Sequence, residues 1–163
     1  MRLTDILKPP EDTALPRIAI IMRGLPGSGK SYWVEAFIAA QSPAMAEFIR
    51  HYGLCSTDSY FITNGVYRFN RTKLAEYHQR NLTQFIMALA KQQGTVICDN
   101  TNLAQWEYMA YDTAARALGY QVRTVLIGNP MDKAHQQVCA ERNRHGVSLA
   151  DIERMARQFQ ADE

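Results

Sequence analysis

The sequence has few cysteines and no long hydrophobic run. Cys55, Cys98 and Cys139 are widely spaced and no CxxC pair occurs, so neither a disulfide framework, a disulfide-linked partner nor a zinc site is expected. The aliphatic run Ile18–Met22 is far too short to span a bilayer. Met1–Pro10 lacks the apolar segment of a secretion signal. We therefore expect a cytoplasmic protein without a membrane partner.

The chain also has little net charge. Its 18 basic and 16 acidic residues give a charge of +2, which neither requires nor excludes a nucleic-acid partner. Hydrophobic residues make up 47% and charged residues 21% of the 163 positions, a composition that excludes a disordered chain. Residues 1–16 contain three prolines and form a lead-in, and we predict a single domain over residues 17–163.

From Arg17 onward, strand-like and helix-like segments alternate, as in α/β proteins with a parallel sheet. We predict a mainly parallel sheet of about four to five strands with helices on both faces. The predicted strands are Ile18–Met22, Leu54–Ser56, Thr95–Cys98 and Gln121–Ile127. The predicted helices cover residues 31–41, 73–93 and 106–117, a segment with Pro130 at its first position, and a final segment capped by Ser148. Trp106 and Met109 are expected in the core.

The first strand is followed by a glycine-rich loop. Its sequence, GLPGSGKS from Gly24 to Ser31, fits the pattern GxxxxGK[ST] between a strand and a helix. In such loops backbone N–H groups surround phosphate oxygens, the lysine reaches the β- and γ-phosphates, and the hydroxyl binds Mg²⁺. The predicted nucleotide-binding residues are Gly24, Pro26, Gly27, Ser28, Gly29, Lys30 and Ser31.

Two further strands end in acidic residues, at the edge where parallel sheets bind ligands. Asp99 follows an apolar strand, where it could hold Mg²⁺ with Ser31 or cap the next helix. Asn100, Thr101 and Asn102 could serve equally well as that cap. Asp58 could accept the proton of an attacking hydroxyl or simply form a turn.

Four segments in this order resemble the phage-type polynucleotide 5′-kinases and their small P-loop relatives. They read GLPGSGKS, STDSYF, VICDNTNLAQWE and ERNRHGVS, and the resemblance covers residues 17–160. It implies a P-loop kinase fold that uses ATP and Mg²⁺. It also implies that Asp58 is the general base on a 5′-hydroxyl and that Lys30 and Ser31 act on the donor. Arg142 and Arg144 would belong to a lid over residues 142–147.

The chain departs from the family at two positions on the acceptor side. Phe61 stands where the phage-type enzyme has an arginine that helps to hold the acceptor strand, and Asn100 stands where it has an acid. The resemblance therefore predicts how this chain uses the phosphate donor better than it predicts which acceptor the chain selects. From the residues alone, the two arginines could equally belong to a solvated helix end.

Basic and aromatic residues alternate between Tyr60 and Asn81. The basic residues are Arg68, Arg71, Lys73 and Arg80, and the aromatic ones are Tyr60, Phe61, Tyr67, Phe69 and Tyr77. This mixture suits single-stranded nucleic acid but also a polar loop with ordinary core aromatics. His78 and Asn81 are either core polar groups or residues that face the acceptor.

The sequence thus predicts ATP-dependent phosphoryl transfer to a hydroxyl, with the 5′-hydroxyl of RNA or DNA as the acceptor. Two alternatives remain open. One is a kinase for a small molecule such as a nucleoside or sugar nucleotide, and the other is a nucleotide-dependent switch that hydrolyses ATP slowly.

Overall fold

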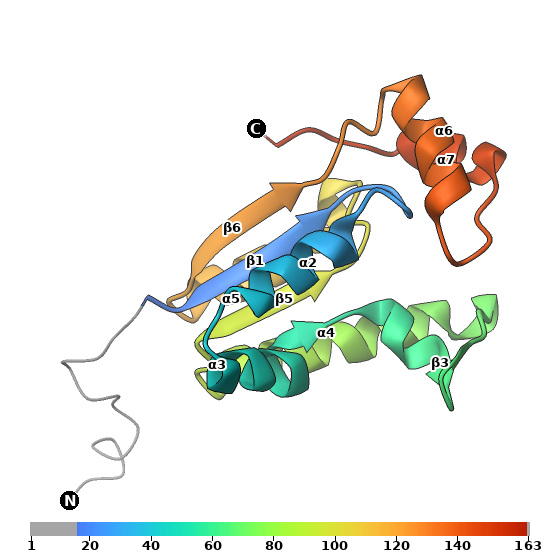
Figure 1. Ribbon diagram of the computed structural model, residues 1–163. Helices are drawn as coiled ribbons and strands as arrows, with labels where there is room; N and C mark the ends of the chain where they lie inside the picture. Colours follow the sequence, from blue (N-terminus) through green and yellow to red (C-terminus); the bar gives the residue numbers. More distant parts are fainter. Residues whose placement is uncertain (1–15, 163) are drawn as a thin grey trace, which may run out of the picture.

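The computed structural model describes residues 16–162. Most of the predicted lead-in, residues 1–15, lies outside this range, as does residue 163. A parallel sheet with the strand order β2-β5-β1-β6 forms the centre (Figure 1). None of the helices within residues 16–162 combines the length and apolar character that crossing a membrane requires.

The central strand, β1 (Ile18–Arg23), is buried over nearly its whole length because it has neighbours on both edges and helices on both faces. It pairs with β5 (Thr95–Asp99) and β6 (Gln121–Leu126), while the short β2 (Leu54–Cys55) lies beyond β5. Continuous apolar strands of this kind are typical of parallel sheets. The predicted sheet is therefore confirmed, with four strands.

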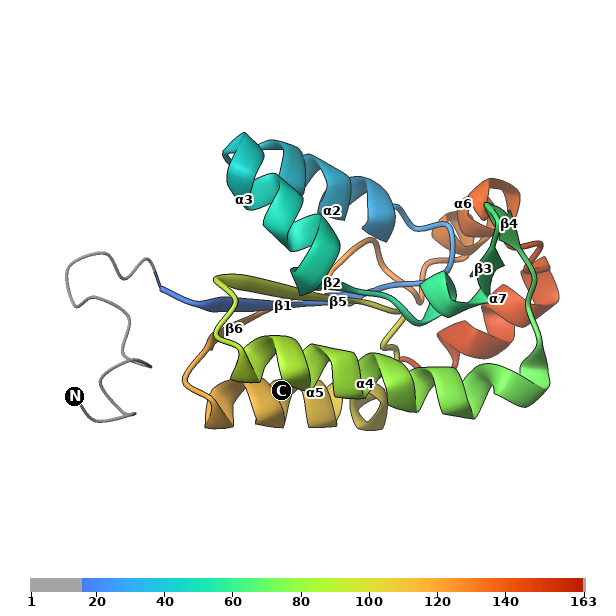
Figure 2. The same ribbon diagram turned by 90° about the horizontal axis from the view of Figure 1, so that it is seen from below.

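Helices cover both faces of the sheet (Figure 2). Helices α2 (Lys30–Ala39) and α3 (Pro43–Phe48) lie on one face, and α4 (Leu74–Ala90) and α5 (Gln105–Ala117) lie on the other. Side chains from alternate positions of β1 enter the two resulting core layers. A third apolar cluster joins Leu25 to α6 (Lys133–Arg142) and α7 (Leu149–Ala156).

Short elements fill the connection from α3 to α4. In chain order they are the π-helix η1 (Ile49–Gly53), β2, the 3₁₀ helix η2 (Thr57–Phe61), the hairpin strands β3 (Ile62–Thr63) and β4 (Val66–Tyr67), and the 3₁₀ helix η3 (Arg71–Lys73). The β3–β4 hairpin and α6–α7 both lie beyond the carboxyl ends of the central strands (Figures 1 and 2).

Two sequence-based expectations are wrong. Trp106 is 76% exposed and Met109 is 60% exposed, because α5 turns Tyr108, Tyr111 and Ala115 toward the core instead. The helix expected to begin at Pro130 begins at Lys133. Asp132 is its N-cap, and the Asp132 carboxylate accepts a hydrogen bond from the Ala134 N–H.

At the start of α5, none of the polar residues 100–102, which were possible caps, occupies the N-cap position. Ala104 occupies the N-cap position, and the Glu107 carboxylate accepts its N–H at 2.7 Å. Asn102 is buried and donates to the Met22 carbonyl instead. The predicted Ser148 cap of α7 is confirmed, since its hydroxyl accepts the Asp151 N–H.

A buried arginine fastens the C-terminal segment to the sheet. Arg23, fully buried at the end of β1, donates to the carbonyls of Asn102, Leu103 and Gln160 and pairs with Asp162 at 3.1 Å. Its guanidinium also lies over the Tyr108 ring. The charge is thereby fully paired.

Candidate active site

The glycine-rich loop lies between β1 and α2, as predicted. Gly24, Gly27 and Gly29 all have positive φ angles, which glycine adopts without steric cost. At Gly27 a side chain is excluded for a second reason: a Cβ atom would lie 2.4 Å from the carbonyl oxygen of Cys139. The loop therefore packs directly on the end of α6.

Lys30 is buried at the start of α2. Its Nζ donates to the carbonyl oxygens of Gly24 and Leu25, both at 2.9 Å. Burial lowers the pKa of Lys30, and the carboxylates of Asp99 and Asp58 oppose that shift. The ammonium group is thus enclosed by the loop, where it could bind donor phosphates.

Ser28 supports a phosphate site in the same loop. Its hydroxyl is buried and has no hydrogen-bond partner within residues 16–162. A buried hydroxyl without a partner is costly. A phosphate oxygen would satisfy it, so the loop fits the group that its sequence predicts.

The predicted metal residues lie together. The Ser31 hydroxyl donates to the Asp99 carboxylate at 3.1 Å, which brings the start of α2 to the end of β5. Burial raises the pKa of Asp99, while the Lys30 ammonium and the Ser31 hydrogen bond lower it. Mg²⁺ typically takes one or two protein oxygens and completes its shell with water and phosphate, so this pair fits the ion.

Asp58 lies on η2 and contacts the predicted lid. Its Oδ2 is 3.5 Å from Nδ1 of His145. The His145 ring stacks on Tyr67 of β4, with 3.9 Å between ring centroids and 8° between planes. Asp58 is therefore contacted by the segment that follows α6.

Residues on both sides of η2 fix its position. The Thr57 N–H donates to Asn100 Oδ1 at 3.0 Å, and the Thr57 hydroxyl lies 3.0 Å from His78 Nδ1. Asn100 thus contacts the segment that carries Asp58. His78 faces this segment, whereas Asn81 is a core residue that donates to the Tyr111 hydroxyl.

Both predicted lid arginines are exposed. Arg142 ends α6 and Arg144 follows it, and within residues 16–162 neither forms an ion pair with a carboxylate. The Asn143 side chain between them donates to the carbonyls of Cys139, Ala140 and Val147 and accepts the Val147 N–H. This network holds the loop while leaving the guanidinium groups available.

Sequence reasoning gave no role to Asn143 or His145, although both lie in the segment ERNRHGVS. The resemblance of this segment to the kinase family was the one signal that pointed to these two residues. Their contacts with distant residues could not be read from spacing, because they depend on how the lid folds.

The fold and the loop define a P-loop nucleotide-binding domain with a kinase-like fold. The AAA domain family (AAA_33) matches residues 20–161. The chain belongs to this family.

Relatives in sequence are much longer proteins. NEDD4-binding protein 2 of Homo sapiens is 34% identical over 145 residues, covering 88% of this chain. YLP motif-containing protein 1 of Homo sapiens is 28% identical over 172 residues, covering 93% of this chain. The chain spans 8% of the length of each.

Two solved structures share the fold. The Pnkp1/Rnl/Hen1 RNA repair complex matches with a TM-score of 0.62 at 14% identity, over 91% of this chain and 45% of that one. A protein of Chloroflexus aurantiacus, described provisionally as a kinase, matches with a TM-score of 0.58 at 16% identity. That match covers 92% of this chain and 83% of the other.

Proposed function

We propose that the protein transfers the γ-phosphoryl group of ATP to the 5′-hydroxyl of RNA or DNA. The observation that carries this proposal is the position of Asp58. It lies at the same edge of the sheet as Lys30 and Asp99, and it contacts the lid through His145. A carboxylate facing the donor phosphates is what an attacking hydroxyl needs.

In the proposed reaction Lys30 and the loop N–H groups bind the β- and γ-phosphates. Asp58 accepts the proton of the acceptor hydroxyl while the hydroxyl oxygen bonds to the γ-phosphorus. The bond between the γ-phosphorus and the bridging oxygen breaks, and ADP leaves. Arg142 and Arg144 balance the charge that spreads over the transferred group. Mg²⁺, held by Ser31 and Asp99, would neutralise charge on the donor phosphates.

A hollow lined by the end of η2, the helix that carries Asp58, supports a nucleic-acid acceptor. It encloses about 520 Å³ at the start of α4 and presents Arg68 and Arg71, which have no carboxylate within ion-pair distance in residues 16–162. Lys73 also lines it, but its ammonium pairs with Glu76 at 3.4 Å. Four aromatic residues, Tyr60, Phe61, Phe69 and Tyr77, also line it, together with Thr63 and Asn70. Cations that bind phosphates and rings that stack on bases are the common features of single-strand sites. We call this hollow the hairpin pocket.

One of the solved structures that share the fold lends support to the proposed acceptor class. The RNA repair complex that shares the fold includes a protein named Pnkp1. Phe61 fits the same interpretation, because it packs on Phe69 and Tyr77 and so shapes the hairpin pocket.

The test supplies γ-labelled ATP with 5′-hydroxyl RNA, 5′-hydroxyl DNA, 5′-phosphorylated controls and free nucleosides. The proposal predicts label on the 5′-hydroxyl oligonucleotides and none on the phosphorylated ones. Lys30→Ala, with its fold checked by thermal melting, should abolish the signal. Label on nucleosides alone would indicate a small-molecule kinase, and ATP binding without any labelled acceptor would indicate a switch.

A further inference from the structure

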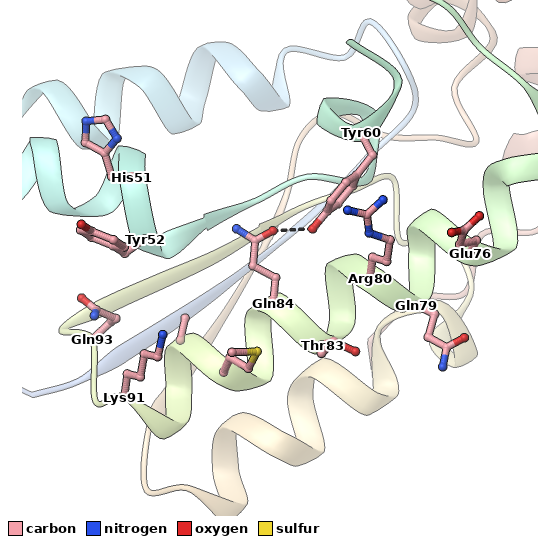
Figure 3. A pocket seen from close by; sticks show the side chains of 12 residues that line it. His51, Tyr52, Tyr60, Glu76, Gln79, Arg80, Thr83, Gln84, Lys91 and Gln93 are labelled. Atoms are coloured by element: carbon pink, nitrogen blue, oxygen red, sulfur yellow. Dashed lines mark hydrogen bonds between the residues drawn. The ribbon is translucent and has the colours of Figure 1, made fainter. Parts of the chain in front are cut away.

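A second hollow adjoins the candidate site on the other side of Tyr60. It encloses about 450 Å³ between η1 and α4 along the β2 edge of the sheet (Figure 3). Tyr60 lines both hollows and follows Asp58 by two residues on η2. We call this second hollow the α4 groove. Whatever occupies it lies next to the proposed acceptor end.

The groove contains cations that lack carboxylate partners. Arg80 and Lys91 both line it, and within residues 16–162 neither lies within ion-pair distance of a carboxylate. The one acidic lining residue, Glu76, is paired with Lys73 at 3.4 Å. The groove therefore favours an anionic occupant.

Aromatic rings stand at both ends of the groove. Tyr52, on η1, is 57% exposed, so its ring is open to a stacking partner. The Tyr60 ring lies under the guanidinium of Arg80, 4.9 Å from its centroid, and the Tyr60 hydroxyl donates to Gln84. The open Tyr52 ring offers a stacking surface for a base, and Arg80 and Lys91, which have no carboxylate partner within residues 16–162, offer charges for phosphates.

Neutral hydrogen-bonding groups complete the lining. Gln79, Gln84, Gln93 and Thr83 are among the lining residues, and Figure 3 shows Gln84 pointing toward Tyr60. Amide and hydroxyl groups can contact bases and sugars without adding charge. Arg80 and Lys91 are eleven residues apart, or about 16 Å along the helix, which matches roughly five stacked nucleotides.

We infer that the α4 groove binds the part of a single-stranded nucleic acid that lies downstream of its 5′ end. This inference rests on the proposed function. The 5′-terminal nucleoside lies at Asp58 and the hairpin pocket, and the following nucleotides pass Tyr60 and extend along α4 toward Lys91. The enzyme then distinguishes oligonucleotides from mononucleotides by the length of strand that the groove holds.

The test measures kcat/KM for 5′-hydroxyl acceptors from a nucleoside 3′-phosphate to an eight-nucleotide strand, as RNA and as DNA. The wild-type value should rise with length. In the Tyr52→Ala, Lys91→Ala double variant, kcat/KM should fall below the wild-type value by a factor that grows with strand length. The factor should reach about tenfold or more on the longest strand. Tyr52→Phe should keep the rise, since a ring remains. The RNA and DNA series identify which acceptor the groove prefers.

Two controls separate the groove from general effects. Arg116→Ala and Trp106→Ala remove an exposed cation and an exposed ring from α5, and they should leave the length dependence unchanged. Arg68→Ala with Arg71→Ala in the hairpin pocket should lower activity at every length. Equal wild-type activity at all lengths, or a uniform loss in the groove variant, would overturn the groove inference alone. A wild-type protein that phosphorylates no oligonucleotide would overturn the proposed function and the groove with it.

Discussion

The carboxylate of Asp58 and the imidazole of His145 lie 3.5 Å apart although 87 residues separate them in sequence. Because His145 also stacks on Tyr67, one side chain joins three parts of the molecule. These parts are the lid loop, the β3–β4 hairpin and the proposed catalytic base. We propose that His145 is a positioning residue for Asp58.

The first prediction concerns this contact. His145→Ala and Tyr67→Ala should each destabilise the fold, and their effects should be coupled by about 0.5–1.5 kcal/mol because the two rings stack on each other. Urea unfolding of both single variants and the double variant measures the coupling. Tyr67→Phe, which keeps the ring, should resemble the wild type, and strictly additive effects would show that the rings do not interact.

The second prediction concerns the contact between the loop and α6. Gly27→Ala should abolish the rise in melting temperature that Mg·ATP gives the wild-type protein, because the new methyl group would meet Cys139. Gly119 has nearly the same φ, +82° against +81°, but open space around its Cβ position. Gly119→Ala should therefore cost only about 1 kcal/mol and retain the ATP response. Equal behaviour of the two variants would contradict this interpretation.

The third prediction concerns the arginines. Arg142→Ala should lower kcat strongly, by on the order of 10³-fold, with a smaller change in ATP affinity. The reason is that a lid arginine acts mainly on the charge that develops during transfer. Arg144→Ala should also lower kcat, but by a smaller factor. Steady-state kinetics with varied ATP separates the two quantities, and full turnover in both variants would remove the lid from the mechanism.

The fourth prediction concerns Arg23. Arg23→Met should destabilise the fold by about 2–5 kcal/mol, because it leaves the carbonyl groups of Asn102 and Gln160 without their donor. Chemical unfolding measures the loss. Arg116→Ala, an exposed control that pairs with Asp112, should stay within about 0.5 kcal/mol of wild type.

The sequence predicted those features that depend on local chemistry. The glycine pattern defines the loop through backbone conformation, and the apolar run Ile18–Met22 defines a strand buried on both faces. The Ser31 and Asp99 contact also followed, because parallel strands bring their carboxyl ends to one edge of the sheet.

Other features depended on tertiary packing. Periodicity located α5, but both of its faces carry large apolar residues. Spacing therefore could not show that Tyr108 and Tyr111 face inward while Trp106 faces solvent. The buried position of Arg23 could not be predicted from sequence, since its partners lie 79 to 139 residues away. The Asp58 and His145 contact was invisible for the same reason.

The most direct test of the central claim is the Asp58→Asn variant. Asparagine keeps the shape of the side chain but cannot accept the proton of an attacking hydroxyl. ATP affinity and phosphorylation of a 5′-hydroxyl oligonucleotide should be measured on the same sample. The account predicts nearly unchanged affinity with transfer lowered by roughly 10²–10⁴-fold, the usual range for a positioned base. Unchanged affinity with unchanged transfer would contradict the role of Asp58 as the base.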